Sequence, residues 1–113
     1  MTGWPFWHVT LTVAGERVPD VEIRHGLERL SHEHPFLLSG RYSTERAEVR
    51  YWEEAPDAGT VASLALRLWE DHRATALLPD WHVVGVEVVD RDTFHTRGRT
   101  QLSPVSLVGV APF

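Results

Sequence analysis

The sequence contains no cysteine among its 113 residues. This absence excludes disulfide bonds, a catalytic thiolate and zinc or iron–sulfur sites with cysteine ligands. Long apolar runs are absent as well, and the opening residues, MTGWPFWHV, lack the basic segment of a signal peptide. We therefore expect a cytoplasmic protein that does not cross a membrane. The sequence contains no motif that indicates a cofactor.

Positive charge is also in short supply. Arginine and lysine together number 11 against 16 acidic residues, which gives a formal net charge of -5. Binding to nucleic acid gains affinity from counterion release, which requires a basic surface. The charge balance therefore disfavours nucleic acid and anionic membranes as partners. The seven histidines can bring the net charge toward zero near their ordinary pKa of about 6.5.

The length and composition indicate one globular domain. A chain of 113 residues can bury its own core. Its hydrophobic fraction of 42% and charged fraction of 24% are ordinary for a soluble protein.

The stretch 36–53, FLLSGRYSTERAEVRYWE, predicts a β-hairpin with residues 43–46 as its loop. Directly opposed residues share one face of a sheet, and a slip of one residue would exchange the two faces. One face would be apolar, while the other would hold an opposite-charge pair at its centre. The expected pairs, from the loop outward, are Tyr42 with Ala47, Arg41 with Glu48, Gly40 with Val49, Ser39 with Arg50, Leu38 with Tyr51 and Leu37 with Trp52.

Four further elements follow from periodicity and end signals. Residues 6–13 alternate between apolar and polar and predict a half-buried strand. A helix is expected after Pro19 and is ended by Pro35, and a second helix is expected after Asp57, a good N-cap residue. The apolar residues of the two helices recur at helical spacing: Ile23, Leu27 and Leu30 in the first, and Val61, Leu64, Ala65 and Leu68 in the second. The valine-rich residues 81–90 predict a last strand.

The resulting order is β-α-β-β-α-β, which resembles the ferredoxin-like α/β plait over about residues 6–90. The chain as a whole resembles small uncharacterised bacterial proteins with this plait. The resemblance implies the α+β class, with an antiparallel sheet that carries both helices on one face because the crossovers are right-handed. We expect residues 1–90 to form the plait and residues 91–113 to form a C-terminal extension.

The extension changes in character along its length. It begins with a basic part that contains Arg91, Arg97 and Arg99, and then becomes rich in aliphatic residues between 102 and 110. Disordered tails seldom carry so many aliphatic side chains. We expect residues 102–110 to be ordered as a fifth strand or as an arm on a neighbouring subunit, with disorder as the alternative.

The open face of the sheet, opposite the helices, is the candidate site. The residues expected to bind a ligand there are His8, Arg41, Glu48, Arg50 and Trp52. A solvated face with cross-strand ion pairs and a dimer made by stacking two open faces are the alternatives. The sequence assigns no catalytic residue and predicts no metal site, since His32 and His34 would point about 200° apart on a helix.

Two functional hypotheses follow from this face. The first is a homo-oligomeric binding or interaction module that uses the open face for self-association or for a small ligand. The alternative is a cofactor-free or metal-assisted enzyme of the dimeric α/β-barrel type, for which His8 and Glu48 are the one acid–base pair that the sequence offers. Nucleic acid binding of the RRM kind would need aromatic residues in a basic setting, which this chain lacks.

Overall fold

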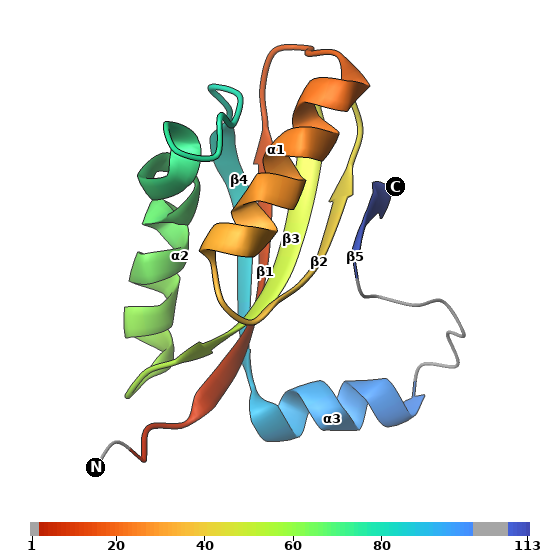
Figure 1. Ribbon diagram of the computed structural model, residues 1–113. Helices are drawn as coiled ribbons and strands as arrows, with labels where there is room; N and C mark the ends of the chain where they lie inside the picture. The colour runs from red at the N-terminus through yellow and green to blue at the C-terminus, as the bar shows by residue number, and fades with distance from the viewer. Residues whose placement is uncertain (1–2, 101–108) are drawn as a thin grey trace.

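The computed structural model describes residues 3–100 and 109–113. Figure 1 shows the elements, which follow one another in this order: β1 (Phe6–Ala14), α1 (Asp20–Glu33), β2 (Leu37–Tyr42), β3 (Arg46–Glu54), α2 (Ala58–Arg73), β4 (His82–Asp90), α3 (Arg91–Thr100) and β5 (Gly109–Pro112).

The described strands form one mixed sheet in the order β4-β1-β3-β2-β5. Neighbouring strands are antiparallel except for β5, which pairs parallel to β2. The protein is therefore α+β, but the expectation of an antiparallel ferredoxin-like plait with two helices is wrong. The difference arises in residues 91–113, which contribute a third helix and a parallel strand.

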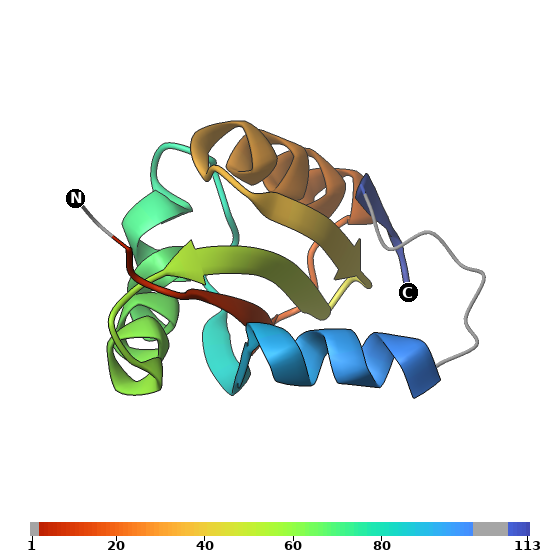
Figure 2. The same cartoon turned by 90° about the horizontal axis from the view of Figure 1, so that it is seen from below.

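The third helix begins at the end of β4 because Asp90 caps it. The backbone N–H of Thr93 donates a hydrogen bond to Asp90 Oδ1 at 2.6 Å, which satisfies one of the free N–H groups of the first turn. This bond also lowers the pKa of the Asp90 carboxyl group. Seen from below (Figure 2), α3 lies on the face of the sheet opposite α1. The predicted open face is thus partly covered by the chain's own helix.

The hairpin has the predicted register close to its loop. Tyr42 lies opposite Ala47 and Arg41 opposite Glu48, and the next two pairs, Gly40 with Val49 and Ser39 with Arg50, are also as predicted. A register shift between Leu37 and Ser39 then places Leu37 opposite Tyr51. The two outermost predicted pairs are therefore wrong, because the irregularity takes up one residue of β2.

The core lies between the sheet and the helices α1 and α2. Val9, Leu11 and Val13 of β1 point into it and are at most 1% exposed. Most of the expected apolar residues of the helices are also buried, whereas Leu64 of α2 is only partly buried. The buried ones are Ile23, Leu27 and Leu30 from α1, and Val61, Ala65 and Leu68 from α2. Asp57 caps α2 as predicted and accepts a hydrogen bond from the Thr60 N–H at 2.7 Å.

The last described residues, 109–113, lie beside β2, where β5 forms an edge of the sheet. The Arg41 guanidinium donates to the Gly109 carbonyl at 2.7 Å, and the Phe113 N–H donates to the Tyr42 carbonyl at 2.9 Å. A fifth strand is therefore present at residues 109–112, whereas residues 102–108 of the predicted segment lie outside the described residues. No helix in the described part of the chain is long and apolar enough to cross a membrane.

Candidate functional site

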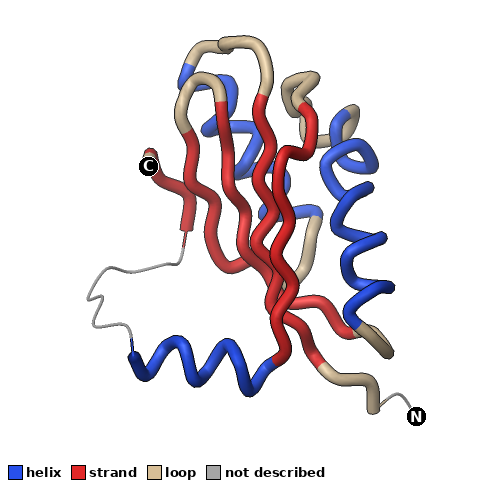
Figure 3. Tube along the Cα trace, turned by 180° about the vertical axis from the view of Figure 1, so that it is seen from behind, coloured by secondary structure: helices blue, strands red, loops and turns tan. Residues whose placement is uncertain are grey.

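The site is built where α3 crosses one end of the sheet. Viewed from behind (Figure 3), α3 leaves the end of β4 and runs toward the side on which β5 lies. Its Phe94 ring packs against His8 of β1, with ring centroids 4.2 Å apart, and against Trp52 of β3 at 4.9 Å. His8 and Trp52 are direct cross-strand partners whose rings meet edge to face at 5.3 Å. The three rings fix α3 to the sheet.

His8 is buried in this cluster and is only 4% exposed. Its pKa is lowered from 6.5 to about 4, chiefly because burial removes the hydration of the cationic form. The positive charge of Arg50 is the second cause of this lowering, Glu87 partly opposes it, and Arg97 makes the smallest contribution. His8 is therefore neutral near pH 7, and its ring acts as packing surface.

The five residues predicted to bind a ligand fall into three groups. His8 and Trp52 lie together beneath α3. Glu48 forms an ion pair with Arg50 of its own strand at 3.2 Å, and Thr12 rather than His8 is its partner on β1. Arg41 lies at the β5 side of the sheet. The acid–base pair of His8 and Glu48 is not brought together.

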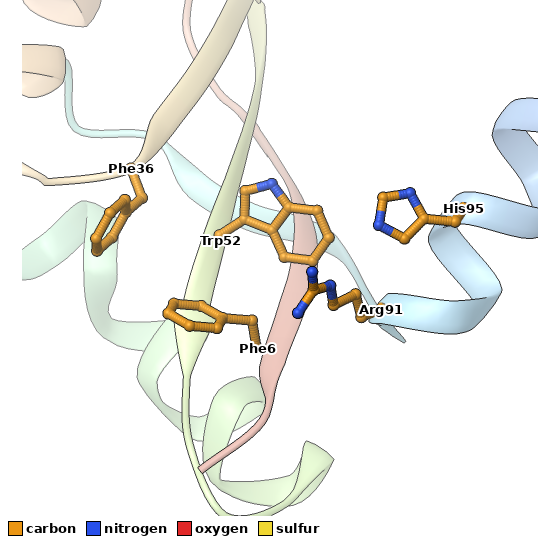
Figure 4. A pocket seen from close by; sticks show the side chains of 5 residues that line it. All are labelled: Phe6, Phe36, Trp52, Arg91 and His95. Atoms are coloured by element: carbon orange, nitrogen blue, oxygen red, sulfur yellow. The ribbon is translucent and has the colours of Figure 1, made fainter. Parts of the chain in front are cut away.

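A cavity of about 350 Å³ opens beside Trp52, between the ends of the central strands and α3. Figure 4 shows its five lining side chains: Phe6 from β1, Phe36 before β2, Trp52 from β3, and Arg91 and His95 from α3. The Phe6 and Phe36 rings meet edge to face, with centroids 6.1 Å apart. Trp52 belongs both to the predicted site and to this cavity.

Phe36 is held in an unusual conformation at the wall of the cavity. Its φ is 65°, which a residue with a bulky side chain rarely adopts, and the residue is 64% exposed. Such a residue costs about 1–3 kcal/mol of backbone strain and is found most often at functional sites. The conformation is not specific to the cavity, because Leu77, which follows α2, also has a positive φ of 54° and is 63% exposed. The Phe36 carbonyl accepts a hydrogen bond from the Trp52 N–H at 3.3 Å, which holds Phe36 at the cavity wall.

Arg91 supplies the positive charge of the cavity. Among the described residues, its guanidinium group has no ion-pair or hydrogen-bond partner. Arg97, six residues further along α3, forms an ion pair with Glu87 at 3.0 Å. The free donors of Arg91 can therefore pair with an anionic group placed among the rings.

The sequence did not reveal four of the five lining residues, namely Phe6, Phe36, Arg91 and His95. The available signal was Asp90, an N-cap residue three positions before Thr93, which would have predicted a helix that begins at Arg91. No local pattern, however, shows where such a helix packs.

A second group of histidines lies where the last turns of α1 and α2 meet. Glu33 Oε1 accepts hydrogen bonds from His72 Nδ1 and from the Thr75 hydroxyl, each at 2.7 Å, and both bonds lower the Glu33 pKa. The His34 ring packs edge to face on Tyr51. His32 is directed elsewhere, with Nδ1 2.8 Å from the Glu28 carbonyl oxygen. No group of three or more His, Asp or Glu side chains among the described residues can hold a metal ion.

The fold and the site define a small α+β protein with an aromatic cavity that contains one arginine. Residues 6–104 match the family model described as a domain of unknown function (DUF8830), and the chain belongs to this family. No curated protein matches the chain.

Proposed function

We propose that the protein is a binding module for a small, flat, apolar molecule that carries a carboxylate or a similar anionic group. The observation that carries this proposal is the composition of the cavity, whose lining combines Phe6, Phe36, Trp52 and the His95 imidazole with Arg91. The Arg91 guanidinium has no partner among the described residues. The ligand would lie among the rings and direct its acid toward Arg91.

The cavity has the properties that such a ligand needs. Its volume of about 350 Å³ falls at the small end of the usual range for ligand sites. Aromatic rings favour planar partners in stacked or edge-to-face contact, and arginine binds carboxylates with two parallel hydrogen bonds. Trp52 is already fixed by His8 and Phe94, so little side-chain freedom is lost on binding.

The arrangement supports binding more than catalysis. His8, the acid–base candidate, lies under Phe94 and does not line the cavity, and Glu48 is paired with Arg50. His95 lines the cavity, but no carboxylate of the described residues lines it to orient the imidazole. We therefore propose that the protein binds a small molecule at one end of the open face and does not act on it chemically.

Titration of the protein with 3-phenylpropionate, followed by tryptophan fluorescence, tests the proposal. We expect saturable quenching from Trp52, and weaker binding of the uncharged 3-phenylpropanamide. Arg91→Gln should weaken binding of the acid about tenfold or more, since a hydrogen bond to a charged group contributes about 1.5–3 kcal/mol. The matched control is Arg67→Gln, an exposed arginine on α2. Equal affinity for the acid and the amide would refute the role of Arg91.

A further inference from the structure

Among the described strands, β4 forms one edge of the sheet and has β1 as its single neighbour. It is nine residues long, contains five valines, and has neither proline nor lysine. Long edge strands normally carry proline or lysine, because their unpaired backbone N–H and C=O groups can otherwise pair with a strand of another chain. The opposite edge is protected against such pairing, because β5 has only four residues and ends in Pro112.

The valines of β4 are more exposed than their position in the sheet requires. Val86 lies opposite Leu11 and Val88 opposite Val9, so both share the face that α1 and α2 cover. Leu11 and Val9 are fully buried, whereas Val86 is 38% exposed. Val84, which has no partner in the β1 register, is 56% exposed. In the described part of the chain, α1 and α2 therefore leave an apolar strip along this edge, formed by Val84 and Val86, uncovered.

We propose that a second copy of this chain covers the strip by pairing its β4 antiparallel to the first, across a two-fold axis through Val86. The two sheets then join into one, and Val84 lies opposite Val88 of the second copy. The valines of both copies close the gap beneath the two α2 helices. Unlike the stacking of open faces, this contact leaves α3 in place.

Charge favours this register over the one shifted by one residue toward Glu87. Opposed residues must share a face, so the pairing can shift only in steps that keep the faces matched. An axis through Val86 places Glu87 opposite Gly85 of the second copy. An axis through Glu87 would place the two Glu87 carboxylates directly opposite each other, which is destabilising. Charge therefore disfavours an axis through Glu87 and is compatible with the axis through Val86.

Light scattering of the full chain tests the association. We expect twice the chain mass of 12.9 kDa at high micromolar concentration. Val86→Lys should produce a monomer with an unchanged circular dichroism spectrum, while Val21→Lys, the same change at an exposed position on α1, should remain dimeric. A monomeric wild-type protein, or a Val86→Lys variant that is folded and still dimeric, would overturn the proposal.

A cysteine cross-link tests the register and does not depend on the lysine variant. The chain has no native cysteine, so Val86→Cys introduces a unique thiol. Opposed residues on paired strands have Cα atoms within the range that a disulfide spans, so mild oxidation should give a covalent dimer. Val84→Cys is the control, because its two copies would lie four residues out of register, about 13 Å apart. Equal cross-linking of both variants, or of neither, would refute the proposed pairing.

Discussion

The burial of His8 predicts a pH dependence of stability that can be calculated. Its pKa is 6.5 in the unfolded chain and about 4 in the folded protein, so between these values the unfolded state binds more protons. Stability therefore rises with pH through this window and falls as the solution is acidified. Each pH unit between two pKa values corresponds to about 1.4 kcal/mol, so His8 alone should lower the free energy of unfolding by about 3 kcal/mol between pH 7 and pH 4.

The variant His8→Phe isolates this contribution from the other titrating groups. Phenylalanine keeps a ring against Phe94 and Trp52 but cannot be protonated. Urea denaturation at pH 7 and pH 4 should show that the wild-type protein loses about 3 kcal/mol more than the variant. His25→Phe, at an exposed position on α1, controls for the added ring.

Direct titration of the His8 ring by NMR supplies the second measurement. We expect the folded protein to show a pKa near 4 for this group. A value near 6.5, together with parallel pH profiles of wild type and His8→Phe, would refute the burial of His8 beneath α3. That result would also exclude the packing of Phe94 of α3 against the His8 ring.

Two further changes test the elements around the site. Asp90→Ala removes the N-cap of α3 and should lower the free energy of unfolding by about 1 kcal/mol, as measured in urea. Asp92→Ala, in the first turn of α3, should cost less, and equal losses would exclude the cap as the cause. Glu48→Gln should cost less than about 1 kcal/mol, because Glu48 and Arg50 are 27% and 35% exposed. A loss of several kcal/mol would show that this part of the open face is enclosed by a partner.

The sequence by itself determined the features that depend on local pattern. Alternation identified β1, helical spacing identified the buried faces of α1 and α2, and Asp57 marked the start of α2. The hairpin register was also predictable near its loop, because opposed residues must share a face. This constraint weakened with distance from the loop, where an irregularity in β2 shifted the last pairs.

The tertiary structure decided everything that joins segments distant in the chain. The capping residue Asp90 could predict a helix, but the position of that helix is set by the packing of Phe94 against the rings of His8 and Trp52. The parallel pairing of β5 with β2 is equally non-local. The cavity combines side chains from four segments, and the physical reason is that its lining depends on where α3 packs. A local sequence pattern predicts the secondary structure of its own segment. The position of that segment in the fold depends on contacts with residues that are distant in the sequence.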